Sequence, residues 1–184
     1  HHFAPLLKTL DLLSPDYMDI ETKVVPILVD MSQRGLMVDQ MARMTMQKKL
    51  ESDRDYYANV MLEHGIDKPG SHQQQGYILG KRGNFLPFTK SKRQYATDED
   101  TLEMIDDPLA TVIIGYTKSV SILSKYIYPM ASMERLYTSY GLDTAVGRTN
   151  SSDFNMQNIP AATSKTGIDV RHIMLPDSGT FTTG

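Results

Sequence analysis

The sequence contains no cysteine, and this single absence removes several classes of protein. Disulfide frameworks, thiolate zinc sites and cysteine nucleophiles all require the thiol group. A chain without cysteine fits a reducing compartment, so we expect a cytoplasmic protein. The sequence also lacks any apolar run of about 18 residues or more, the length that a membrane-spanning helix needs. We therefore expect no membrane partner.

Motifs of self-contained catalytic sites are also missing. There is no G-x-S-x-G elbow, no Walker A loop and no G-x-G-x-x-G turn after a strand. The five histidines have no spacing that would form a metal-ligand set. The acidic pair Asp106-Asp107 precedes Pro108, which is the arrangement of a helix cap. We therefore predict no catalytic residue and no metal ligand in this chain.

Basic charge is scarce overall, since the formal net charge is -3, whereas free nucleic-acid binders usually carry a basic excess. Its distribution modifies this conclusion. Between positions 81 and 93 there are five basic side chains and no acidic one, while acids crowd positions 98–107. The basic side chains are Lys81, Arg82, Lys90, Lys92 and Arg93. The stretch is either an ordinary solvated loop or a binding loop.

Apolar spacing and capping residues predict that most of the chain is helical. A length of 184 residues corresponds to about one or two domains. Asp39 offers an N-cap to a long helix without Pro or Gly, and Ser71 with Gln74 forms a capping-box signal. Thr97 and Asp98 can cap a short acidic helix. The predicted helices cover 20–31, 40–64, 72–80, 98–105 and 108–131.

The last of these helices has the clearest apolar stripe. From Leu109 to Met130 apolar residues alternate at spacings of four and three, which predicts antiparallel packing against the helix at 40–64. After Ala131 the pattern changes to strands at 136–142 and 172–183. We therefore predict a mainly α fold with a small β part. Its divisions are an N-terminal lead-in at 1–19, with His1-His2 as a tag remnant, a helical domain at 20–131 and a mixed part at 132–184.

The segment Gly147–Pro160 is dense in small and amide side chains. Arg148 can direct a planar charged fork at a phosphate or into a groove. Amides at Asn155, Gln157 and Asn158 offer donors to the acceptors that every base pair shows in the minor groove. Recognition of duplex without sequence choice is one interpretation. The other is an Asx-rich loop whose amides cap their own backbone.

Order along the chain adds a resemblance to a known family. Segment 147–160 is similar to the T-G-R-L-S-S-x-x-P-N-L-Q-N-I-P motif of family A DNA polymerases, the DNA polymerase I type. Further resembling segments follow the family's order. They are 21–39 with its Met-x-x-x-Gly turn, 69–74 with Ser71 and Gln74, Thr97 with Leu102, 116–127, and 167–172 with a G-x-x-V-R pattern.

The resemblance implies long antiparallel thumb helices followed by the first strands of a polymerase palm. The chain would be a fragment or subunit of a DNA-dependent DNA polymerase that grips primer-template duplex. Positions that match the motif imply DNA contacts by Arg148, Asn155, Gln157 and Asn158. Ser71 matches a backbone-contacting serine and is equally a plain N-cap. The implied DNA-binding set is completed by Lys90, Lys92, Arg93 and Arg171.

In the family, palm carboxylates hold two magnesium ions for nucleotidyl transfer. The chain ends a residue or two before the family's Asp-Tyr-Ser-x-Ile-Glu motif, so we expect no activity from it alone. Magnesium and deoxynucleoside triphosphates would bind only with the rest of the polymerase, whether in the same polypeptide or in a second chain. A non-enzymatic duplex-binding module and a protein-interaction domain remain alternatives.

Several positions depart from the family pattern and imply a weaker grip on duplex. Ser121 stands where the family often has a lysine, Val146 replaces a threonine, Phe154 replaces a proline and Ala162 replaces an arginine. The sequence at 69–74 and the compact basic loop favour a viral, phage-type or divergent member, in which case the setting is the host cytoplasm.

Overall fold

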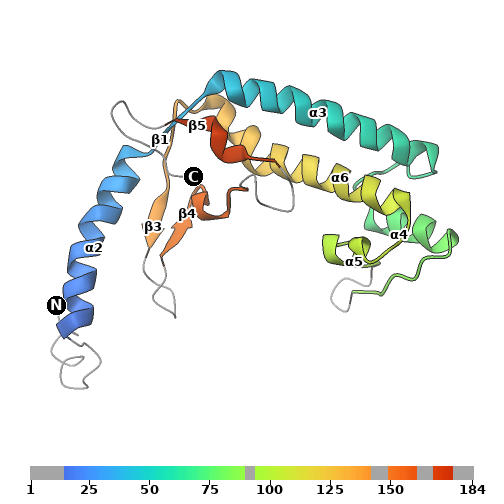
Figure 1. Cartoon of the computed structure of the whole chain (residues 1–184), viewed down its shortest axis with the longest axis horizontal. Helices are drawn as coiled ribbons and strands as arrows, with labels where there is room; N and C mark the ends of the chain where they lie inside the picture. Colours follow the sequence, from blue (N-terminus) through green and yellow to red (C-terminus); the bar gives the residue numbers. More distant parts are fainter. Residues whose placement is uncertain (1–14, 90–93, 142–148, 161–167, 176–184) are drawn as a thin grey trace.

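The chain folds as an elongated arm built on two long helices that lie side by side (Figure 1). The computed structural model describes residues 15–89, 94–141, 149–160 and 168–175. Helix α3 (Gln40–Glu63) and helix α6 (Pro108–Ile122) run in opposite directions along the arm. This confirms the predicted antiparallel pair and the mainly α fold with a small β part. In the described ranges no helix combines the length and apolar character needed to cross a membrane.

Capping residues set the starts of the helices, as the sequence predicted. The Asp39 carboxylate accepts a hydrogen bond from the Ala42 amide at 2.9 Å, and α3 begins at the next residue. Ser71 caps α4 (His72–Lys81), and Asp98 caps α5 (Glu99–Glu103). Thr97 does not cap α5, because its side chain is buried and its hydroxyl lies 2.5 Å from Nδ1 of His72.

Helix α2 (Pro15–Arg34) precedes the pair and is longer than predicted at both ends. The predicted regular helix over 108–131 is wrong beyond Ile122. A π-helical turn (η1, Leu123–Ile127) and a 3-10 turn (η2, Pro129–Ser132) follow α6. Pro129 has no amide hydrogen to donate, so an α-helix cannot continue through it unbroken. The apolar stripe nevertheless stays buried through Ile127 and Met130.

Two apolar clusters form the core, one at each end of the α3–α6 pair. The near cluster joins Leu50 of α3 and Leu123 after α6 to Leu136, Ile159 and Ile173. The far cluster joins Met61 of α3 to the other helices of that end. Its other members are Ile66, Leu79, Leu86, Leu102, Leu109, Ala110 and Ile113. The near cluster contains residues from both sides of residue 131, so the helical part and the strands share one core.

The strands differ from the predicted ones. Strand β1 (Leu36–Val38), which the sequence marked as a turn, is the middle of a three-stranded antiparallel sheet in the order β2-β1-β5. Leu36 pairs with Leu136, and Met37 pairs with both Arg135 and Leu175. Gly35 permits this approach, since its φ is 59° and a Cβ there would overlap the Leu136 carbonyl oxygen.

The strand predicted over 136–142 is two strands in different sheets. Strand β2 (Arg135–Leu136) pairs with β1, whereas β3 (Ser139–Gly141) pairs with β4 (Asn150–Ser152). The strand predicted over 172–183 is confirmed only at β5 (Met174–Leu175). A 3-10 turn, η4 (Val170–Ile173), precedes β5, and residues 176–184 lie outside the described ranges. Partners far apart in sequence decide these short strands.

At the far end of the arm, Asp107 joins three structural elements. Its buried carboxylate caps α6 through the Leu109 amide at 2.9 Å and accepts hydrogen bonds from Arg82 Nε at 2.7 Å and Nη2 at 3.0 Å. Asn84 Nδ2 donates to the same carboxylate at 2.9 Å. The Arg82 guanidinium is the main cause that lowers the pKa of Asp107 to about 2.

We predict that Asp107→Asn lowers the free energy of unfolding at pH 7 by about 1–2 kcal/mol, a range that allows for the solvent exposure of Arg82. Because the pKa of Asp107 in the folded protein lies below its unfolded value, this stabilisation is present above about pH 4 and lost as the pH falls toward about 2. Urea unfolding at pH 7 and at low pH measures it. Asp106→Asn, at the exposed neighbouring position, is the control and should change little. Equal effects of the two substitutions would contradict the assignment.

Two glycines of α4 provide a second, matched prediction. A Cβ at Gly76 would overlap the Tyr95 Cβ and Cγ, whereas a Cβ at Gly80 meets no atom within 4 Å. We expect Gly76→Ala to destabilise the protein by about 1–3 kcal/mol, through overpacking. Gly80→Ala should stabilise it by about 0.5–1 kcal/mol, through helix propensity alone. Thermal unfolding of both variants tests this, and stabilisation by Gly76→Ala would disprove the close packing.

Candidate nucleic-acid interface

The amides of the 147–160 segment lie on a short turn at the base of the arm. Strand β4 leads through Asp153, whose φ is 68°, into a 3-10 turn, η3 (Met156–Asn158). Aspartate is among the residues that adopt this left-handed conformation most readily. Asn155, Gln157 and Asn158 are all exposed, whereas Phe154 and Ile159 on either side are buried. The segment thus presents its amides on a surface that is anchored at both ends.

Asn155 has mainly a local role. Its Oδ1 accepts hydrogen bonds from the Asn158 amide at 3.1 Å and from the Ser151 hydroxyl at 3.1 Å, and so it caps η3. The Ser151 hydroxyl accepts in turn from the Gln157 amide at 3.3 Å. The self-capping interpretation is therefore right for the Asn155 acceptor. The Asn155 amide group also exposes surface, and the turn that it caps carries the other two amides.

Gln157 and Asn158 present their side chains to solvent. Gln157 Nε2 donates to the exposed hydroxyl of Thr149 at 2.9 Å, which holds the amide beside β4. Within the described ranges, the Asn158 side chain has no hydrogen-bond partner. Its backbone carbonyl is held by the Tyr126 hydroxyl, which donates at 2.7 Å. The turn therefore fixes the Asn158 backbone and leaves its donor and acceptor atoms available to a ligand.

The π turn after α6 positions the Tyr126 hydroxyl that holds the Asn158 carbonyl. In η1 the Tyr128 amide donates a hydrogen bond to the Leu123 carbonyl at 2.9 Å. This bond spans five residues instead of the four of an α-helix, so the side chains between them point in different directions than in an α-helix. Tyr126 in this turn meets Phe154 edge-to-face, with ring centroids 6.0 Å apart. Burial raises the pKa of the Tyr126 hydroxyl, so it remains a proton donor at neutral pH. Phe154, which replaces the family's proline, thus has a packing role.

Arg171 lies beside the same turn. Its Nε donates to the Ile159 carbonyl at 3.4 Å, and its backbone amide donates to the Asp169 carboxylate at 3.0 Å. The side chain as a whole is exposed. The structure therefore brings Arg171 together with Asn155, Gln157 and Asn158, although the sequence separates it from them by more than ten positions.

Ser71 lies elsewhere, at the far end of the arm where α4 packs against α6 (Figure 1). Its Oγ accepts from the Gln74 amide at 3.4 Å, which confirms the N-cap. The capping box is only half formed, because Gln74 Oε1 accepts from the Lys68 amide and not from Ser71. Arg148, Lys90, Lys92 and Arg93 lie outside the described ranges.

The residues that sequence reasoning missed are those that support the turn. In the sequence, Tyr126 falls within the resembling segment 116–127 without a role of its own, and Ser151 is one of the small side chains of 147–160. In the structure Ser151 is 7% exposed and links two amides of the turn. The cap itself has a usable local signal, since Asn155 stands three residues before the amide that it accepts from. No local signal marks Tyr126, because its partner lies 32 residues away.

The candidate interface is an exposed turn. A pocket of about 440 Å³ does lie between α3 and η4, lined mainly by apolar atoms of residues such as Met46, Leu50 and Ile168. The amides of η3 are not among its lining residues. In the described ranges no three histidine or acidic side chains lie close enough together to hold a metal ion.

Comparison with known proteins matches this chain to DNA polymerases. The family model of DNA polymerase family A matches residues 38–183. DNA polymerase I of Caldicellulosiruptor bescii is 29% identical over 189 aligned residues, which cover 95% of this chain and 22% of that protein. DNA polymerase theta of Drosophila melanogaster is 26% identical over 85% of this chain and 8% of its own length.

A solved structure shares the fold. It is the POL domain of Pol1 from M. smegmatis in complex with DNA primer-template and dNTP, with a TM-score of 0.68 and 22% identity over 83% of this chain and 28% of that one. The chain spans about a fifth of the length of the DNA polymerase I relatives that it matches. Since the family model covers most of its residues, this chain belongs to DNA polymerase family A.

Proposed function

We propose that this chain is the thumb (20–131) and the first strands of the palm (132–184) of a DNA-dependent DNA polymerase, and that it holds primer-template duplex. Residues 1–19 are the proposed lead-in. The observation that carries the proposal is the exposed pair Gln157 and Asn158 on a turn whose backbone is held by Asn155 and Tyr126. Family membership supports it, as does the DNA primer-template in the Pol1 complex.

The chemistry of the turn suits the minor groove. Every base pair shows acceptors there, and an unpaired carboxamide supplies two donors without a net charge. Arg171, beside the turn, supplies a cation for the phosphates, and Arg148 is proposed to add a second. Contacts of this kind do not select a sequence, which is what a copying enzyme requires.

The far end of the arm provides the second proposed contact with duplex. Ser71 lies at this end, where α4 packs against α6, and Lys90, Lys92 and Arg93, which lie outside the described residues, are proposed to contact the phosphates as well. The fifteen residues of α6 correspond to about 22 Å at ~1.5 Å per residue. Duplex DNA rises by about 3.4 Å per base pair, so the two contacts would be separated by roughly six base pairs. Contacts so spaced would hold the duplex in orientation as well as in place.

Template-directed DNA synthesis is proposed for the whole protein, in the cytoplasm, and not for this chain alone. Magnesium ions and deoxynucleoside triphosphates would be held by further parts of the polymerase, whether in the same polypeptide or in a second chain. This chain spans only about a fifth of the length of its DNA polymerase I relatives. We accordingly propose that the purified chain does not extend a primer.

We predict that Asn158→Ala weakens binding of the chain to a labelled primer-template by about 5- to 10-fold, the cost of one lost amide contact. Fluorescence anisotropy at low salt measures it. Asn59→Ala is the matched control, because Asn59 is an exposed amide near the C-terminal end of α3, away from η3 in sequence. Arg148→Ala should in addition reduce the slope of log affinity against log salt by about 0.9.

Two results would oppose the proposal. Duplex affinity that Asn158→Ala leaves at the wild-type value would remove η3 from the interface. Complete absence of salt-dependent duplex binding would favour a protein-interaction domain instead. Asn155→Ala is expected to lower both affinity and stability, because Asn155 caps the turn, so thermal unfolding distinguishes it from Asn158→Ala.

A further inference from the structure

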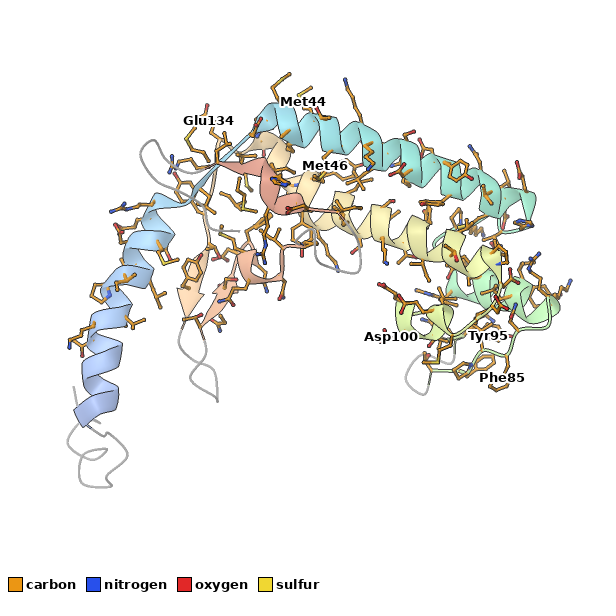
Figure 2. All side chains as sticks on the ribbon, viewed as in Figure 1. Met44, Met46, Phe85, Tyr95, Asp100 and Glu134 are labelled. Carbon is orange, nitrogen blue, oxygen red and sulfur yellow. The ribbon has the colours of Figure 1, made fainter. Side chains whose placement is uncertain are left out.

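Aromatic rings gather on the surface of the far end of the arm. Phe85 is 89% exposed, Phe88 58% and Tyr77 52%. All three lie within twelve residues of sequence around the end of α4 and the segment that follows it. Figure 2 shows Phe85 beside Tyr95 at this end, away from the body of the arm. Large apolar side chains exposed together on one surface indicate a binding site more often than single ones do.

The fold holds these rings outward. Leu86, which lies between the two phenylalanines in the sequence, is 5% exposed and belongs to the far core cluster, whereas its neighbour Phe85 is 89% exposed. Phe88 and Tyr95 pair across an antiparallel bridge, with ring centroids 4.5 Å apart. The backbone bonds Thr89 amide to Gln94 carbonyl and Ala96 amide to Pro87 carbonyl, both 2.8 Å, close this bridge on each side.

Tyr95 is itself fixed, because its ring rests on Gly76 of α4. One face of the Phe88 ring therefore packs on a rigid support, and the ring retains 58% of its surface for solvent. A supported ring loses little conformational freedom when a second planar group stacks on it, which lowers the cost of binding.

A cation lies beside one of these rings. The exposed Lys81 ammonium lies 4.6 Å from the centroid of the Tyr77 ring, so the cation stands over an exposed aromatic ring. Three of the nearby acids have internal partners. Asp107 pairs with Arg82, Glu99 pairs with Lys118 at 2.8 Å, and Asp98 accepts from the Thr101 hydroxyl at 2.8 Å.

We propose that the surface formed by Tyr77, Lys81, Phe85 and Phe88 binds single-stranded nucleic acid, with bases stacked on the phenylalanine rings and a phosphate near Lys81. Exposed rings interleaved with cations are the arrangement that binds single strands without sequence choice, since every base has a flat face. Duplex offers no free base faces along its length, so this surface would take a strand that is not paired. The inference rests on the proposed function, because it assigns a second nucleic-acid surface to a protein proposed to handle primer-template.

The test is binding of the full chain to a labelled oligothymidylate strand, which has no secondary structure, measured by fluorescence anisotropy. Phe85→Ala is expected to weaken binding by about 5-fold, and the double variant Phe85→Ala/Phe88→Ala by about 10-fold or more. Blunt duplex should bind both variants within about twofold of wild type. Tyr56→Ala is the matched control, since Tyr56 is 63% exposed but lies on α3.

An abasic strand of the same length separates stacking from charge. We expect the wild-type chain to bind it about as weakly as the double variant binds oligothymidylate. Equal affinity for the two strands, or a double variant that binds oligothymidylate like wild type, would overturn the proposal. The second result, with duplex binding retained, would favour a protein ligand at this surface and leave the proposed function intact. Loss of duplex binding by Asn158→Ala tests that function separately.

Discussion

The antiparallel packing of α3 on α6 is the interaction on which the rest of the structure depends. Both helices extend through two separate apolar clusters, so each end of the arm has its own core while the helices share a direction. The near cluster holds the strands and the η3 turn, and the far cluster holds α4, α5 and the aromatic surface. Burial of Leu50 and Met61 on one side and of Leu109, Ile113 and Leu123 on the other fixes the register of the pair. The distance between the two proposed nucleic-acid contacts follows from it.

At each end of the arm, hydrogen bonds add to the apolar packing and fix the positions of surface segments. At the far end, Asp107 ties the start of α6 to Arg82 and Asn84, beside the segment that presents Phe85 and Phe88. At the near end, Tyr126 ties the π turn to the carbonyl of Asn158. Both bonds join the end of a helix to a segment that is distant in the sequence. The exposed rings and amides are thus positioned by buried partners, which keeps them available for ligands.

Features that depend on contacts between residues close in the sequence could be predicted, whereas features that depend on contacts between distant residues could not. The caps at Asp39, Ser71 and Asp98 act within four residues, and their helices began where expected. Strand β1 was missed because its three residues acquire strand geometry from partners about one hundred and about 137 positions away. The continuous strand expected at 136–142 failed for the same reason, since two different partners divide it. For the candidate site, the amides could be named from the motif, but not the tyrosine that supports them.

By itself, the sequence determined the helical character, the starts of the helices, the antiparallel pair and the resemblance to DNA polymerase family A. These features depend on capping residues, apolar periodicity and motif order, which are all properties of the sequence itself. Only the tertiary structure decided which exposed groups share a surface. It placed Arg171 beside the η3 turn, separated Ser71 from that turn by the length of α6, and used the Asn155 acceptor for internal capping. The physical reason is that burial and hydrogen bonding between distant segments choose which side chains are satisfied inside the protein and which remain free to bind.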